Sequence, residues 1–181
     1  MIPEKIQTAF NEQIMHETYS AWLYLSMAAW LEAEGFEGMG QWMRVQTQEE
    51  LTHAMRFYNH ILERGGSVEL LAIEKPPAKW ESPLAAFEAA LEHERFITGK
   101  INELMALTLK ENDFASKTML QWFVDEQVEE EDNATKNVQN TKMVGGKGQG
   151  MLMLDREMGQ RTFVYPPAIA SPASPAADAG A

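Results

Sequence analysis

Residues 48–57 read QEELTHAMRF, and no other stretch of the chain constrains its fold as strongly. Glu50 and His53 lie three residues apart in this stretch. On a helix, side chains with this spacing share one face, so a carboxylate oxygen and an imidazole nitrogen point to the same place. A single Glu-x-x-His pair is common on helix surfaces, so its meaning depends on the rest of the chain.

Matching acids occur in three other stretches that are rich in apolar residues. They are Glu17 in residues 13–25 (QIMHETYSAWLYL), Glu94 in residues 89–97 (AALEHERFI), and Glu126 to Glu131 in residues 122–132 (WFVDEQVEEED). Burying a carboxylate is costly unless something neutralises its charge. Four helices that each direct an acid inward therefore predict a cation at their centre.

Apolar residues recur at helical spacing in four long segments and one short one. The predicted helices span about residues 4–32, 36–64, 82–110, 114–143 and 151–160. Gly65 and Gly66 stop the second, and Ser82 followed by Pro83 is a typical helix start. The core candidates of the second helix are Trp42, Val45, Met55 and Ile61.

The lengths of the connections predict the topology. Short turns follow the first and third helices, so each of these pairs forms an antiparallel hairpin. A helix of about 28 residues is about 42 Å long. The roughly 15 residues between the second and third helices can span about 50 Å. The expected fold is all-α: a four-helix bundle with one long crossover and a short fifth helix. Residues 1–162 form this domain, and the Pro/Ala-rich residues 163–181 are predicted to be disordered.

Composition excludes several classes of function. The 181 residues contain no cysteine, which excludes disulfides, Fe–S clusters and thiolate zinc sites. The formal net charge of -12 disfavours nucleic acid as a partner. No apolar run approaches the roughly 20 residues of a membrane span, and no secretory signal is evident. We therefore expect a cytoplasmic protein without membrane or nucleic acid partners.

The acids fit the pattern of a dinuclear metal site in a helical bundle. Such sites take one Glu from each of two helices and Glu-x-x-His from each of the other two. Glu17 and Glu94 match the single glutamates, and Glu50 with His53 matches the first pair. The fourth helix departs from the pattern, because it has Gln127 and Glu130 where the second pair is expected.

With these motifs the chain resembles the prokaryotic non-haem ferritins over about residues 1–162. The resemblance is carried by QIxxExxxxxxY from Gln13, EExxHA from Glu49, LEHE from Leu91 and WFVDEQVEEE from Trp122. Bacterioferritins resemble the same fold but bind haem through a methionine just before the second-helix histidine. Thr52 stands at that position here, so we expect no haem.

The resemblance implies a ferroxidase site of two irons. It assigns Glu17, Glu50 and His53 to one iron, Glu94 and Glu130 to the other with Glu50 bridging, and Gln127 beside them. It also implies a third, weaker iron site made of Glu49, Glu126 and Glu129, sometimes with Glu130; the alternative is an acidic inner surface. Tyr24 and Trp122 match aromatic residues that can give up an electron, although Tyr24 can equally be a core tyrosine bonded to a ligand.

The implied function is iron storage with ferroxidase activity. Fe(II) binds at the site, O2 or H2O2 oxidises it, and the ferric product mineralises inside a homo-oligomeric shell of 24 subunits. Two alternatives remain open from the residues. The first is a diiron oxidase or peroxide-handling protein without storage. The second is a structural bundle whose acids bind cations weakly.

Overall fold

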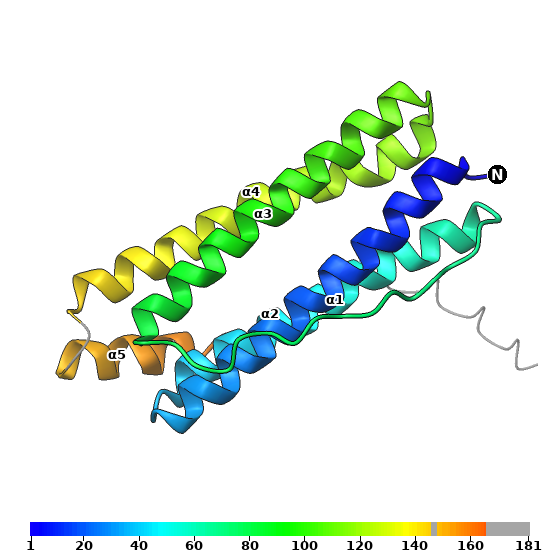
Figure 1. Ribbon diagram of the computed structural model, residues 1–181. Helices are drawn as coiled ribbons and strands as arrows, with labels where there is room; N and C mark the ends of the chain where they lie inside the picture. Colours follow the sequence, from blue (N-terminus) through cyan, green and yellow to red (C-terminus); the bar gives the residue numbers. More distant parts are fainter. Residues whose placement is uncertain (146–147, 166–181) are drawn as a thin grey trace, which may run out of the picture.

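The computed structural model describes residues 1–145 and 148–165, and within this part all regular elements are helices (Figure 1). They are α1 (Glu4–Ala33), α2 (Glu37–Glu63), α3 (Pro83–Lys110), α4 (Phe114–Met143) and α5 (Gln149–Met158). The all-α prediction is confirmed. The long helices begin and end within one residue of their predicted limits, whereas α5 lies two residues earlier in the chain. No described helix has the length and apolar character needed to cross a membrane.

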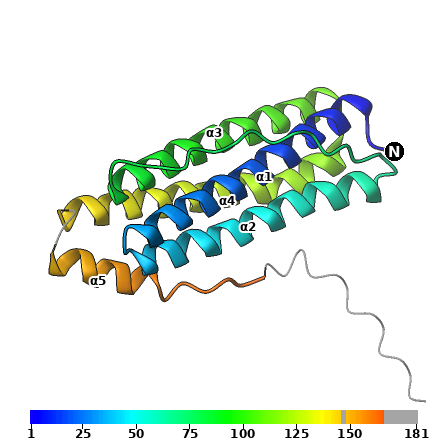
Figure 2. The ribbon, with the colours of Figure 1, turned by 60° about the horizontal axis from the view of Figure 1, so that its bottom comes forward.

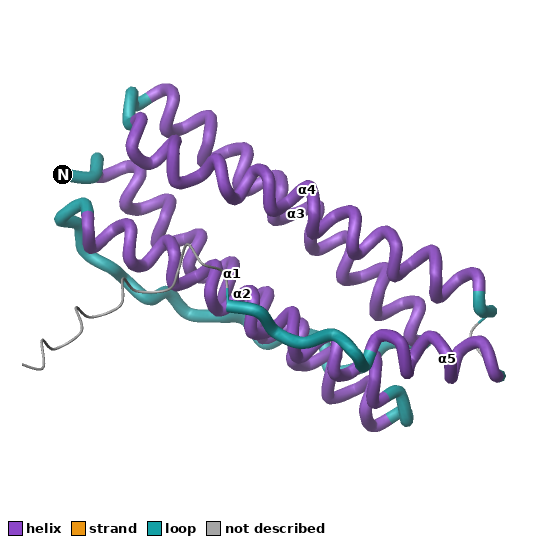
Figure 3. The backbone as a smooth tube through the Cα atoms, turned by 180° about the vertical axis from the view of Figure 1, so that it is seen from behind, coloured by secondary structure: helices purple, strands orange, loops and turns teal. Residues whose placement is uncertain are grey.

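The helices pair as two antiparallel hairpins joined by a long crossover. α1 packs on α2, and α3 packs on α4. The crossover, residues 64–82, runs along the α1–α2 hairpin from one end of the bundle to the other (Figures 1 and 3). Hydrogen bonds tie it to α1 near both ends: Asn11 Nδ2 donates to the carbonyl of Ser67 over 3.3 Å, and Ser26 Oγ donates to the carbonyl of Pro77 over 2.6 Å. This is the predicted ferritin-like topology.

Local sequence explains where the crossover begins and ends. Gly65 has a φ of +69°, a conformation that favours glycine after a helix. A Cβ on Gly66 would lie 2.5 Å from Gln7 Oε1 and 2.7 Å from Ile2 Cγ2, so a larger residue here would have to displace these side chains. At the other end, Ser82 Oγ accepts a hydrogen bond from the N–H of Ala85 over 3.1 Å and caps α3, with Pro83 as its first residue.

Two apolar clusters fill the bundle, one toward each end. The cluster toward α5 includes Met27, Met39, Met43, Phe87 and Met158. The cluster toward the chain's N-terminus includes Ile6, Phe10, Phe57, Ile97 and Phe123. Along each long helix, the buried acids fall between the residues of these two clusters, and so do Gln46 and Gln127. The polar groups therefore form one layer across the middle of the bundle.

One core prediction is wrong. Met55 is 44% exposed, although Val45 and Ile61 are buried as predicted and Trp42 is half-buried. Met55 lies two residues after His53, which places it about 200° around the helix from the buried imidazole. The buried face of this part of α2 is instead continued by Ala54 and Phe57.

Candidate metal centre

Each long helix contributes to the polar layer at mid-bundle. Six of the side chains in this layer, each no more than 5% exposed, are Glu17 (α1), Glu50 and His53 (α2), Glu94 (α3), and Gln127 and Glu130 (α4). No lysine or arginine is among them. The layer thus holds four buried carboxyl groups and one imidazole, with no permanently positive side chain to balance the carboxylate charge. Such a layer favours the binding of cations.

Glu17, Glu50 and His53 form a first group whose possible ligand atoms all lie within 4.8 Å of one another. His53 Nδ1 is 3.4 Å from Glu50 Oε2. Glu17 Oε2 is fully buried and has no hydrogen-bond partner among the described residues. A buried oxygen without a partner is costly, and a metal ion coordinated by this oxygen would remove that cost. The group therefore fits a metal ion.

His53, Glu126 and Glu130 form a second group, again within 4.8 Å. His53 Nε2 is 3.9 Å from Glu126 Oε1, so the two ring nitrogens of His53 face carboxylates of different helices. Glu126 is only half-buried, and the second group is therefore the more open of the two.

Glu94 lies outside both groups and is held by two donors. The Tyr24 hydroxyl donates to Glu94 Oε1, and Gln127 Nε2 donates to Glu94 Oε2 over 3.2 Å. Tyr24 is 1% exposed and its ring packs against His93. The structure thus gives Tyr24 the hydrogen bond to a candidate ligand that was one of its two predicted roles.

Two glutamines that were not predicted complete the layer. Gln13 Nε2 donates to Glu17 Oε1 over 2.9 Å. Gln46 Nε2 donates to Glu50 Oε1 over 3.1 Å and to Glu130 Oε2 over 2.8 Å. Each glutamine precedes its glutamate by four residues, the spacing of helical neighbours. This Gln-x-x-x-Glu spacing is a sequence signal that could have identified both.

Burial and mutual repulsion raise the pKa of every carboxyl in the layer. Burial, then the charge of Glu50, raises the pKa of Glu17 to about 8, and the same two causes raise the pKa of Glu94 to about 8. Burial and the charge of Glu94 raise the pKa of Glu130 to about 8. Burial, then Glu130, holds the pKa of Glu50 well above its usual range. Without a cation these groups retain protons near neutral pH, so metal binding must release them.

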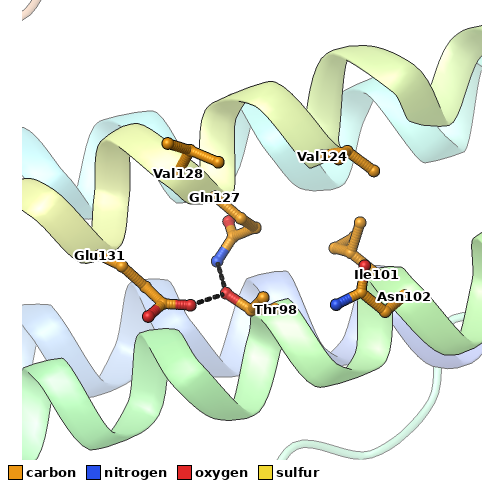
Figure 4. A pocket seen from close by; sticks show the side chains of 7 residues that line it. All are labelled: Thr98, Ile101, Asn102, Val124, Gln127, Val128 and Glu131. Atoms are coloured by element: carbon orange, nitrogen blue, oxygen red, sulfur yellow. Dashed lines mark hydrogen bonds between the residues drawn. The ribbon is translucent and has the colours of Figure 1, made fainter.

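A groove on the surface between α3 and α4, about 350 Å³ in volume, leads toward this layer. It is lined by Thr98, Ile101, Asn102, Val124, Gln127, Val128 and Glu131 (Figure 4). Thr98 Oγ1 donates to Glu131 Oε1 over 2.6 Å, and Gln127 Nε2 donates to Thr98 Oγ1 over 3.3 Å. Because Gln127 also bonds Glu94, a hydrogen-bonded chain links the half-exposed Glu131 to the buried layer.

The structure does not gather the carboxylates of the predicted third site into one group. Among the described residues, Glu126 groups with His53 and Glu130, and Glu49 is paired with Arg161 over 2.5 Å. Glu129 is exposed. Burial raises the pKa of Glu49, although Arg161 opposes the shift.

Trp122 lies beside the layer. Its ring centroid is 5.4 Å from that of His53, and the Arg56 guanidinium carbon lies 4.2 Å from the Trp122 ring centroid. The contact with His53 places an aromatic ring next to a candidate ligand, and it also serves packing.

Comparison with known proteins agrees with this description. The family profile of the ferritin-like domain matches residues 7–144. A bacterial non-heme ferritin of Bacteroides fragilis is 42% identical over 161 residues, which cover 89% of this chain and 100% of that protein. A probable bacterial non-heme ferritin-like protein of Haemophilus influenzae is 35% identical, covering 88% of this chain and 96% of its own length.

Solved structures show the same likeness. An open-pore ferritin from the hyperthermophilic archaeon Archaeoglobus fulgidus superposes with a TM-score of 0.88 at 48% identity, covering 90% of this chain and 100% of its own. An engineered closed form of the Archaeoglobus fulgidus ferritin gives a TM-score of 0.89. The chain therefore belongs to the ferritin family, as a prokaryotic non-haem ferritin.

Proposed function

We propose that this ferritin oxidises Fe(II) at the mid-bundle layer and stores the ferric product. Membership of the family supports iron storage. The observation that carries the ferroxidase proposal is the first group: two carboxylates and an imidazole, almost fully buried, with one carboxylate oxygen that has no hydrogen-bond partner in the described part of the chain. Such a group has little structural purpose without a cation.

Two Fe(II) ions would bind as substrates in this layer. Glu17, Glu50 and His53 hold one ion, and Glu94 with Glu130 holds the other, with Glu50 between them. The donors on Glu94, Tyr24 and Gln127, restrain the carboxylate that faces the second ion. Carboxylate and imidazole ligands suit Fe(II), and donors outside the ligand set typically tune affinity by about 10- to 100-fold.

Oxidation follows from holding two ions together. Dinuclear sites place their metals about 3.5–4 Å apart, so both can face one O2 or H2O2 molecule. Each Fe(II) gives one electron, and the pair together reduces O2 to the level of hydrogen peroxide. The Fe(III) produced is a stronger acid than Fe(II) and hydrolyses. Protons leave both from the carboxyls when the metal binds and from water during hydrolysis.

Tyr24 is proposed to act at Glu94. Its hydroxyl donates a hydrogen bond to the Glu94 carboxylate, so it can position this ligand. A tyrosine bonded directly to a ligand can also supply an electron. Trp122 is a second candidate electron donor, beside His53.

The wider setting is proposed from the family. We propose a homo-oligomeric shell of 24 subunits in the cytoplasm that encloses the ferric mineral, with no haem. Glu49, Glu126 and Glu129 are proposed to bind a third, weaker iron on its way to the store. Residues 1–162 would suffice for this function, and most of the remainder, residues 166–181, lies outside the described part of the chain.

Stopped-flow titration of the metal-free assembly with Fe(II) in air tests the proposal. We expect a fast phase that saturates at about two irons per chain, as a dinuclear site requires. Slow uptake of many more irons should follow. A rate that rises without any break at that ratio would overturn the ferroxidase assignment.

A second candidate function is a diiron oxidase that does not store iron. The observation that favours it is the groove between α3 and α4, which brings a surface opening next to Gln127 and Glu94. Under this alternative the fast phase saturates at the same ratio, but no further iron is taken up. The search for a substrate would then turn to small organic molecules that fit the groove.

A further inference from the structure

Arg161 reaches the candidate metal centre from the segment that follows α5. This segment runs back alongside α2 (Figure 2). α5 is fixed against the start of α2, because the N–H of Met39 donates to Asp155 Oδ1 over 2.9 Å. The two backbones are so close that a Cβ on Gly38 would lie 1.7 Å from the carbonyl oxygen of Asp155. α5, which ends at Met158, three residues before Arg161, is thus held firmly against α2.

The Arg161 guanidinium makes four contacts with one face of α2. Nη2 bonds Glu49 Oε2 over 2.5 Å, and Nη1 bonds Gln46 Oε1 over 2.8 Å. Nη1 also donates to the carbonyl of Trp42 over 3.4 Å, and the guanidinium carbon lies 4.3 Å from the Trp42 ring centroid. The side chains of Arg161 and Glu49 are each 22% exposed, so solvent screens this pair less than an ordinary surface pair.

The contact with Gln46 transmits the position of Arg161 to the metal ligands. Arg161 has only donors, so the Gln46 atom that faces it must be the amide oxygen. The amide nitrogen therefore points the other way, toward Glu50 and Glu130. Arg161 thereby fixes which end of the Gln46 amide the buried carboxylates meet.

The contact with Glu49 places a fixed positive charge on one ligand of the proposed third iron site. We propose that Arg161 is a built-in counter-cation that competes with a third metal ion for Glu49 and so keeps that site weak. This inference rests on the proposed function. A divalent ion that shares Glu49 with the guanidinium is repelled by it, or must displace it. The third ion is then held loosely, which suits iron in transit to a store.

Calorimetric titration of the assembled, metal-free protein with Zn(II) tests the inference. Zn(II) takes carboxylate and imidazole ligands and has no redox chemistry, so binding is separated from oxidation. We expect Arg161→Gln to tighten the third binding step by about tenfold, within the range typical of changes beside a metal ligand. The order of the steps should stay the same, with the two tighter ions in the buried layer.

Three further variants distinguish competition from other effects. Arg44→Gln is the matched control, because it removes a guanidinium from α2, the helix that carries Glu49, where Arg44 pairs with Glu32 over 2.5 Å on the exposed surface. It should leave the third step unchanged. Arg161→Lys keeps the positive charge and should keep the third step weak. Adding Glu49→Gln to Arg161→Gln should abolish the gain, because the competition is for that carboxylate.

Some results of these titrations would overturn the role of Arg161, and one would overturn the proposed function. An unchanged or weaker third step in Arg161→Gln, in a chain with wild-type circular dichroism and assembly size, would overturn the inference. So would a gain that survives Glu49→Gln, or an equal gain in Arg44→Gln. If wild type lacks the two tighter steps as well, the proposed function itself fails. Two intact tight steps with an unresponsive third step defeat only the role of Arg161.

Discussion

The buried group of Glu17, Glu50 and His53 and the Glu49–Arg161 pair differ in how their charge is balanced. Glu17 and Glu50 are at most 2% exposed, and among the described residues neither pairs with a lysine or an arginine. Glu49 is more exposed and pairs with the permanently charged guanidinium of Arg161. The carboxylate of Glu49 is therefore neutralised within the chain, whereas the carboxyls of the buried group are not.

This difference in charge balance affects stability. The buried group lowers the stability of the metal-free chain, because burying carboxylates costs free energy, and a bound ion would restore it. The Glu49–Arg161 pair avoids that cost, because the guanidinium already balances the charge of the carboxylate.

Removal of the shared imidazole should have the largest effect. His53→Ala deletes a member of both groups, so fast Fe(II) oxidation should fall by at least about 100-fold, more than changes beyond the ligands produce. The helix should persist, because alanine is a good helix former. Stopped-flow absorbance checks the rate, and circular dichroism checks the fold. Wild-type kinetics in the folded variant would remove His53 from the site.

The pH dependence of the melting temperature of the metal-free protein tests the charge of the buried carboxyls. Glu17, Glu94 and Glu130 have a pKa of about 8 in the folded chain, against an ordinary value of 4.5. A carboxyl whose pKa is raised by folding stabilises the fold fully below its unfolded pKa, and this stability is lost as pH rises toward the folded pKa. The melting temperature of the metal-free protein should therefore fall between about pH 5 and pH 8.

Two controls accompany the melting series. Saturating Zn(II) should abolish the fall, because the bound ion favours the charged carboxylates. Glu17→Gln should make the curve shallower and raise the melting temperature at pH 8, while it weakens metal binding. A melting temperature of the metal-free protein that rises over this range would contradict the account of the buried layer.

A smaller effect is expected at Tyr24. Tyr24→Phe keeps the ring but loses the hydroxyl that bonds Glu94, so affinity for the second ion should fall by about tenfold. Anaerobic Fe(II) titration measures this affinity, and electron paramagnetic resonance during oxidation tests the redox role. A tyrosyl signal that is absent in the variant would assign electron transfer to Tyr24. If the affinity for the second ion is unchanged in Tyr24→Phe and wild type gives no tyrosyl signal, Tyr24 serves only in packing.

The smallest effect is expected at the C-terminus. Deletion of residues 166–181 leaves Arg161 and every side chain described at the site in place. Assembly size, melting temperature and the rate of Fe(II) oxidation should all match those of the full chain. Loss of assembly would show that the domain extends beyond the predicted residue 162.

The spacing of residues predicted the fold and the burial of the candidate ligands at mid-bundle, because both depend on local periodicity. Glu50 and His53 share a face by their spacing alone, and the helix limits follow from Gly65 and Ser82, whose conformational preferences are local. The length of the crossover then predicted how the two helical hairpins are connected.

What the sequence could not show depends on contacts between distant residues. Arg161 is 112 residues from Glu49 in sequence, and no periodic pattern connects them. The grouping of Glu126 with His53 depends on how α4 is rotated against α2. Met55 was placed in the core because its residue type is apolar, while the rotation of α2 turns it outward.

Anomalous diffraction at the iron edge, from crystals loaded anaerobically with Fe(II), tests the central claim most directly. The account predicts two strong peaks in each chain, about 3.5–4 Å apart, within the layer formed by Glu17, Glu50, His53, Glu94 and Glu130. A third, weaker peak should lie beside Glu49 and strengthen in Arg161→Gln. Iron found only at exposed acids such as Glu131, with none in the buried layer, would contradict the account.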